Sequence, residues 1–149
     1  MAKTETLEEF YHNKLITAPQ RLEQGVGHFN VFRLIDCIGP GSTPVTYTRR
    51  DFYKVSLLYG KHIYHYADKS IMVDGVNLIF FNPNVPYTIE RITEVAKGYF
   101  CIFTEAFFTE KIRGSLNELP MFSMGGKSVY ELDEKKEEFV AGIFEKMLE

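Results

Sequence analysis

The sequence predicts a mainly β fold: a small barrel or sandwich preceded by a short helical arm and followed by helices. Short extended segments follow one another through the middle of the chain, and turn signals separate them. The 149 residues include 13 Phe and 9 Tyr but no Trp, and aromatic side chains favour strands and line small-molecule cavities. Helical periodicity replaces the strand pattern after Phe103. The length fits a single domain with one substantial core.

Residues 1–24 are predicted to form an arm with one short helix. Thr6 and Glu9 have the S/T-x-x-E spacing of a capping box, which marks a helix N-terminus. The helix should end near Leu15, and Pro19 prevents a longer one.

Residues 25–103 are predicted to form the β body. In its second strand, alternation places Lys54 and Ser56 on one face and Tyr53 on the other. Asp74-Gly75 is a strong hairpin dipeptide. The predicted strands are Phe29–Ile38, Asp51–Tyr59, Ile63–Ala67, Ile71–Val73, Val76–Phe81, Tyr87–Ile92 and Gly98–Phe103.

Residues 104–149 are predicted to form a helical dimerisation segment. Thr104 can cap a helix over residues 105–113, a brief extended piece follows near Val129, and Asp133 can cap a final helix. That helix carries an apolar stripe wide enough to pack on the barrel and also on a second copy of the chain. The predicted homodimer contacts are Phe139, Val140, Ile143, Phe144 and Met147.

Charge and cysteine usage narrow the class of protein. A formal net charge of −3 argues against a duplex-binding surface, which needs clustered Lys and Arg. We see neither a signal-peptide h-region nor a run of about 20 apolar residues, so we expect a cytoplasmic protein with no membrane partner. Cys37 and Cys101 lie in apolar stretches and are expected to be buried thiols, with a disulfide as the alternative.

Four segments carry a resemblance to a known family: Arg49–Lys54, His65–Asp68, Phe81–Tyr87 and Gly98–Thr104. Together they resemble the N-terminal cupin domain of AraC-family transcription regulators, particularly those of Bacteroidetes, over nearly the whole chain. The resemblance implies a jelly-roll (double-stranded β-helix) barrel that holds a small effector, a helical dimerisation segment, and DNA binding through a C-terminal domain with two helix-turn-helix units. That domain, of about 100 residues, is absent from this sequence, so we expect the native chain to continue past Glu149.

The ligand pattern of metal-dependent cupins is replaced throughout. An H-x-H-x3-E set followed by a later His would fall on Thr48, Arg50, Lys54 and Tyr87. Two of these are cationic, so we expect no metal and no other cofactor. His62 and His65 cannot substitute, because residues three apart on a strand point to opposite faces. His12 and His28 have no recognisable partner in the sequence.

The sequence favours a binding protein over an enzyme, because it contains no nucleophile elbow, P-loop or Cys–His arrangement. If the barrel is cupin-like, Arg and Lys side chains would suit a small polar or anionic effector. The candidate pocket residues are Thr48, Arg50, Tyr53, Lys54, Tyr64, Phe81 and Tyr87. Two alternatives stay open: the barrel is packed shut, with the cations paired to Asp51 or Glu90, or the chain is a free-standing small cupin, either a metal-free binding protein or a sugar-type isomerase or epimerase.

Overall fold

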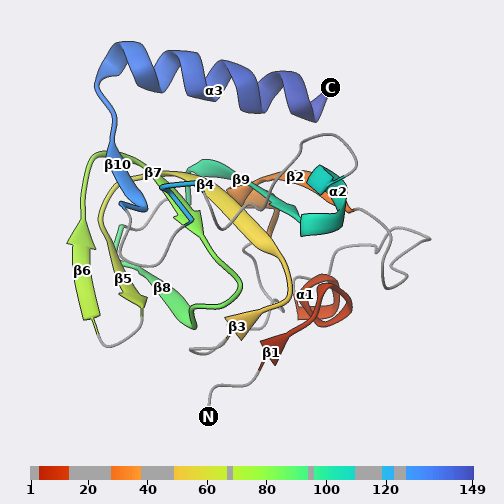
Figure 1. Cartoon of the computed structure of the whole chain (residues 1–149). Helices are drawn as coiled ribbons and strands as arrows, with labels where there is room; N and C mark the ends of the chain where they lie inside the picture. Colours follow the sequence, from red (N-terminus) through yellow and green to blue (C-terminus); the bar gives the residue numbers. More distant parts are fainter. Residues whose placement is uncertain are drawn as a thin grey trace.

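The protein is built from two antiparallel sheets that face one another, with one long helix across the outside of the larger sheet (Figure 1). The computed structural model describes residues 4–13, 28–37, 49–66, 69–93, 96–109, 119–122 and 127–149. The mainly β fold predicted from the sequence is therefore confirmed. No helix in these ranges is long and apolar enough to cross a membrane.

The larger sheet has five strands in the order β10-β7-β4-β9-β2. Their bounds are Val129–Glu131 (β10), Val76–Phe81 (β7), Tyr53–Tyr59 (β4), Gly98–Phe103 (β9) and Phe29–Arg33 (β2). Every neighbouring pair is antiparallel, and β4 is central, so both of its edges are hydrogen-bonded. The sheet order is not the sequence order, because β9 lies between β4 and β2.

The smaller sheet has three antiparallel strands in the order β6-β5-β8. They are Lys69–Val73 (β6), His62–Tyr66 (β5) and Tyr87–Arg91 (β8). Two glycines lie in turns where the chain passes from one sheet to the other: Gly60 has φ +97° and Gly75 has φ +80°, a region that side chains with a Cβ rarely adopt. Asp74-Gly75 joins β6 to β7, but these strands belong to different sheets and are not paired with each other, so the hairpin predicted at this dipeptide is wrong.

The two faces of the large sheet have different covers. On the inner face, Leu58, Ile79 and Phe81 pack against Tyr64, Val73 and Tyr87 of the small sheet, and we call this group the aromatic cluster. Further along the same face, Phe32, Phe100 and Ile102 pack against the arm helix α1 (Leu7–Asn13), and we call this group the arm cluster. Both clusters are fully buried, so α1 completes a layer that the small sheet covers only in part.

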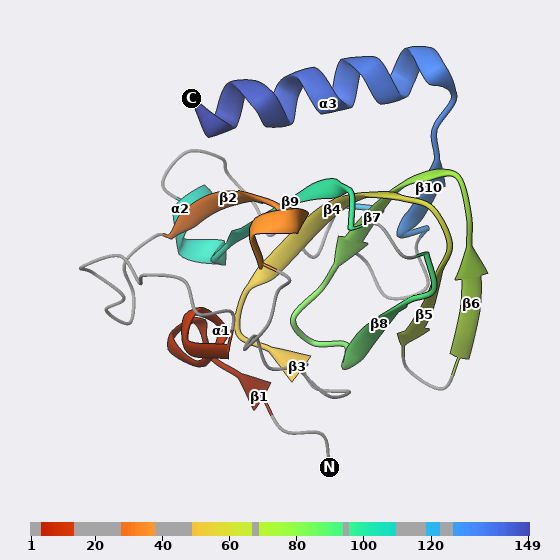
Figure 2. The ribbon, with the colours of Figure 1, turned by 180° about the vertical axis from the view of Figure 1, so that it is seen from behind.

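The outer face of the large sheet is covered by α3 (Glu134–Leu148). Phe144 is buried against Tyr99 with nearly parallel rings 5.4 Å apart. Figures 1 and 2 show α3 spanning the molecule on the side opposite to α1. The chain is therefore layered as helix, five-stranded sheet, and then small sheet together with α1.

Most predicted elements are confirmed, and one strand prediction is wrong at its end. Thr6 Oγ1 accepts from Glu9 N–H at 3.1 Å, which confirms the capping box, and Asp133 Oδ1 accepts from Lys136 N–H at 2.8 Å. The first predicted strand stops at Arg33, and Leu34–Cys37 form a short 3₁₀ helix instead. The helix α2 is described over Glu105–Thr109, and the rest of its predicted span lies outside the described residues.

The arm is tied to the body at a second point. β1 (Thr4–Glu5) pairs in parallel with β3 (Arg49–Arg50), although neither strand was predicted. A pair of two-residue strands has no hydrophobic periodicity to reveal it in the sequence.

Candidate functional site

Lys54 lies at the boundary between the aromatic cluster and the arm cluster. Its ammonium is 4.7 Å from the centre of the Phe100 ring and 5.4 Å from that of Phe81. Phe100 belongs to the arm cluster and Phe81 to the aromatic cluster. The side chain is half-buried, so a cation is held against two aromatic faces where water has limited access. Such a cation attracts an anionic group more strongly than one in bulk water does.

Three other predicted pocket residues converge beside Lys54. The ring centres of Phe81 and Tyr87 are 4.2 Å apart and nearly parallel, and Tyr64 meets Phe81 edge-on at 5.2 Å. All three are buried, and they come from β5, β7 and the start of β8. The structure therefore brings together four of the candidate pocket residues named from the sequence: Lys54, Tyr64, Phe81 and Tyr87.

Tyr53 is not part of that group, because it lies on the opposite face of β4. Its ring stacks on Phe103 with centres 5.5 Å apart and meets Phe122 edge-on at 4.9 Å. Burial raises the pKa of its hydroxyl to about 12, and the carboxylate of Glu105 adds to the shift. Tyr53 is thus a core residue beneath the outer layer.

The other two members of the predicted set are not placed in a site. Thr48 lies outside the described residues. Arg50 belongs to β3, where its backbone pairs with Glu5, and its side chain is not described. The candidate site is therefore defined by Lys54, Tyr64, Phe81 and Tyr87.

Two buried polar side chains beside this site were missed. Ser56 is 2% exposed and lies two residues from Lys54 on the inner face of β4. His62 is 1% exposed and shares its face of β5 with Tyr64. Burial lowers the pKa of His62, with a smaller lowering by Arg91 across the strand pair and an opposing effect of the Gly60 carbonyl. Strand alternation already placed Ser56 with Lys54, so the signal for Ser56 was present in the sequence.

The arm helix is fixed by a buried polar contact as well as by its rings. The Tyr11 hydroxyl is 2.7 Å from His28 Nε2, and Asn30 Nδ2 donates to the same hydroxyl at 3.0 Å. The oxygen accepts from Asn30, and its own proton can be donated to Nε2 of a neutral His28 ring. Burial lowers the pKa of His28, which favours that neutral form. His28, without a recognisable partner in the sequence, therefore holds α1 on the sandwich.

The helix α3 divides the predicted dimerisation residues between its two faces. Phe144 is buried against the sheet, and Val140 and Met147 pack partly on the same cluster. Phe139 and Ile143 face away, with 71% and 45% of their surfaces exposed. Phe139 and Ile143 are thus the predicted contacts most open to a second molecule, and substituting Met147 would also disturb the core.

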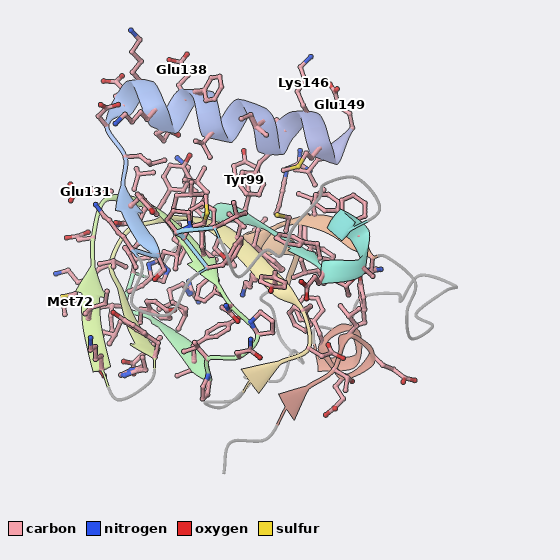
Figure 3. All side chains as sticks on the ribbon, in the orientation of Figure 1. Met72, Tyr99, Glu131, Glu138, Lys146 and Glu149 are labelled. Atoms are coloured by element: carbon pink, nitrogen blue, oxygen red, sulfur yellow. The ribbon has the colours of Figure 1, made fainter. Side chains whose placement is uncertain are left out.

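Polar contacts fasten α3 to strands β2, β4 and β9. Tyr59 donates a hydrogen bond to Glu137, and Tyr99 donates to Glu145 at 2.7 Å. Arg33 reaches the same Glu145 carboxylate at 3.0 Å. These donors lower the pKa of Glu145, Tyr99 most and then Arg33. Figure 3 shows Tyr99 between the sheet and α3, and Glu138 and Lys146 on the far side of the helix.

A separate polar group occupies the outer face of the small sheet. His65 Nδ1 is 2.7 Å from Ser70 Oγ, and His65 Nε2 is 3.9 Å from a Glu90 carboxylate oxygen. The group is solvent-exposed and crosses all three strands, as pairs that stabilise a sheet do. His62 and His65 do point to opposite faces, as predicted from their spacing.

No metal centre can be assembled from the part of the chain that the structure describes. There, no three His, Cys, Asp or Glu side chains lie close enough together to hold a metal ion. Cys101 is buried as a free thiol, as predicted, and burial raises its pKa to about 12. The side chain of Cys37 is not described.

Comparison with known proteins gives no assignment. No protein-family model matches the chain, and no curated protein matches it. The class of protein defined by the structure is thus a β-sandwich with an inward cation among aromatic rings and a helix fastened to its outer face.

Proposed function

We propose that this chain is an effector-sensing and dimerising regulatory domain with a cupin-like, double-stranded β-helix barrel, and that it binds its ligand without chemical conversion. Two antiparallel sheets facing each other around an aromatic interior support the cupin-like reading. The observation that carries the proposal is Lys54, an inward-facing cation at the boundary between the arm and the small sheet.

The effector is a small anion. The inner layer brings the Lys54 ammonium together with the rings of Phe81, Tyr87 and Phe100. A site with apolar walls and one positive group suits a small organic acid, because the charge fixes orientation and the rings contribute apolar contact. A carboxylate or phosphate displaces little hydration from a cation that is already partly shielded from water.

Calorimetric titration with a panel of carboxylates, sugar acids and organic phosphates tests the effector site. The variant Lys54→Met keeps the stem length and removes the charge, so binding should fall at least tenfold. Lys127→Met is the matched control, because the Lys127 ammonium also lies over a ring, that of Tyr130 at 5.1 Å, but on the surface. Equal binding by wild type and Lys54→Met, or no stabilisation by any anion, contradicts the anionic effector.

The second half of the proposal is a symmetric dimer through the outward face of α3. Phe139, Gly142 and Ile143 form the apolar centre of this face, and a Cβ added to Gly142 would meet nothing within 4 Å. A second copy is the occupant that charge complementarity indicates. In an antiparallel pair centred on Gly142, Glu138 lies opposite Lys146 of the second copy, and Lys135 lies opposite its Glu149. The two-fold symmetry repeats each pair, as an isologous interface requires.

Light scattering during size-exclusion chromatography tests the dimer. Phe139→Glu combined with Ile143→Glu should give a monomer whose thermal unfolding is unchanged, because both side chains face away from the sandwich. Glu138→Lys should weaken the dimer, and adding Lys146→Glu should restore it by reversing both members of the pair. A wild-type monomer at high concentration, or a double variant that stays dimeric, contradicts the assignment.

We extend the proposal to transcription regulation on the AraC-family resemblance, with DNA contacted by a domain outside this sequence. The net charge of −3 supports placing DNA contact elsewhere. Reading the native coding sequence beyond the Glu149 codon tests this extension. A continuing frame with two helix-turn-helix patterns is the expected result, and a frame without them removes the regulatory role but not the binding role.

A further inference from the structure

Two buried polar atoms in the inner layer have no partner in the described parts of the chain. Among those residues, none forms a hydrogen bond with Ser56 Oγ or His62 Nε2, and both side chains are buried. Buried polar groups in native proteins are nearly always hydrogen-bonded, so each of these requires an explanation. A ligand that supplies the missing bonds is one explanation, and a purely structural water is the other.

Both atoms face the same interior. Ser56 is directly opposite Ile79 on the neighbouring strand, and His62 is directly opposite Val73. Ile79 and Val73 belong to the aromatic cluster, so the two polar side chains approach one cluster from the two sheets. Because strand residues two apart project to the same side, Ser56 also shares its face with Lys54, about 7 Å away along β4.

The hydrogen-bonding roles of these atoms follow from their neighbours. His62 Nδ1 is 3.3 Å from the Gly60 carbonyl, which can only accept, so Nδ1 carries the ring proton. Burial favours the neutral imidazole, and Nε2 is then an acceptor. The Ser56 hydroxyl both donates and accepts. The interior therefore offers a cation at one end and, further along, an acceptor and a hydroxyl.

We propose that Ser56 and His62 recognise a hydroxyl group of the bound effector, and that the effector class is small hydroxy acids. The carboxylate lies at Lys54, and the hydroxyl accepts from the Ser56 hydroxyl and donates to His62 Nε2. The inference rests on the proposed effector site and adds the second recognition element. A site with unpaired buried groups discriminates strongly against an analogue that lacks the matching hydroxyl.

The test uses straight-chain hydroxy acids of roughly three to six carbons, a length set by the strand spacing, each paired with its deoxy acid. Calorimetry on the wild type should show at least one hydroxy acid bound tenfold or more tightly than its partner. In Ser56→Ala that ratio should approach one, while binding of the deoxy acid is retained. Ser70→Ala is the control, because the Ser70 hydroxyl is bonded to His65 on the outer face.

The ligand-free stability of the same variants separates recognition from a structural water. Removing a hydroxyl without a partner should leave the melting temperature of Ser56→Ala unchanged or raised, whereas a hydroxyl held by a structural water stabilises the fold and its loss lowers that temperature. A lowered melting temperature with an unchanged hydroxyl preference overturns the inference. Equal binding of hydroxy and deoxy acids overturns the inference alone, while no binding of either acid overturns the anionic effector site as well.

Discussion

At the scale of single residues, β4 shows what alternation can and cannot predict. It correctly separated Lys54 and Ser56 from Tyr53. It could not say which face was inside, because β4 is covered on both sides. The polar residues turn towards the small sheet, and the apolar face with Tyr53 and Leu57 turns towards α3. A polar face normally indicates solvent, so its burial is the strongest residue-level indication of a site.

The Tyr11 hydroxyl should contribute measurably to stability, although its ring contributes more. Tyr11→Phe removes the bonds to buried His28 and half-buried Asn30. We expect a loss of about 1–2 kcal/mol in the free energy of unfolding. Urea titration followed by circular dichroism measures it. Tyr130→Phe, which loses an exposed hydrogen bond to the Lys127 carbonyl, should lower the free energy of unfolding clearly less. An equal loss would show that the Tyr11 hydroxyl stabilises the fold no more than an exposed tyrosine hydroxyl does.

Cys101 should be inert in the folded protein. Its pKa of about 12 means that almost no thiolate exists at pH 8, and only the thiolate reacts with Ellman's reagent. In a Cys37→Ser background, the absorbance from the reaction of Ellman's reagent with Cys101 should rise only as fast as the protein unfolds. Immediate labelling of one thiol in the absence of denaturant would contradict the buried placement of Cys101.

At the scale of elements, capping chemistry predicted where helices begin, because a cap depends on neighbours in the sequence. The Thr6 capping box and the Asp133 cap form as predicted, whereas Asp74-Gly75 carries the chain from one sheet to the other and forms no hairpin. The error at Leu34–Cys37 has a tertiary cause. Among the described strands, β2 pairs with β9 alone, and the last pair joins Arg33 to Tyr99, one residue from the start of β9 at Gly98. Extended backbone beyond Arg33 would therefore soon run past the end of β9.

The cap of α3 can be tested directly. Asp133→Ala removes the acceptor of the Lys136 N–H and should lower the free energy of unfolding by about 1 kcal/mol. Asp133→Asn keeps an acceptor oxygen and should stay near wild type. Thermal and urea unfolding of the three proteins provide the comparison. A loss in Asp133→Asn as large as that in Asp133→Ala would mean that the negative charge, and not the cap, stabilises the helix.

At the scale of the whole molecule, the inner and outer layers meet on the same strands. β4 and β9 present Lys54 and Phe100 inward and Tyr59 and Tyr99 outward, where the two tyrosines bind α3. The sequence predicted an interior site and a helix with two roles, but not that two strands connect them. Strand order and layer assignment depend on contacts between residues far apart in the chain, such as Arg33 with Glu145. The periodicity of a sequence does not indicate such contacts.

The whole molecule should also lose stability as the pH falls from 7 to about 5.5. His28 and His62 both have a pKa lowered by burial from the ordinary 6.5, so the unfolded chain binds protons that the folded chain excludes. Stability is therefore complete above pH 6.5 and declines below it, by up to about 1.4 kcal/mol per pH unit for each histidine until its folded pKa is reached. Protonation would also make His28 Nε2 a donor, so it could no longer accept from the Tyr11 hydroxyl.

Urea unfolding at pH 7.5, 6.5, 6.0 and 5.5 measures this slope, in a window above the range where most carboxylates titrate. His28→Gln and His62→Leu should each flatten the slope, since each removes one excluded proton, even if it also lowers the absolute stability. His65→Gln is the control, because His65 lies on the exposed outer face of the small sheet. A slope that stays the same in both buried-histidine variants, or stability that rises towards pH 5.5, would show that these imidazoles are not held neutral inside the fold.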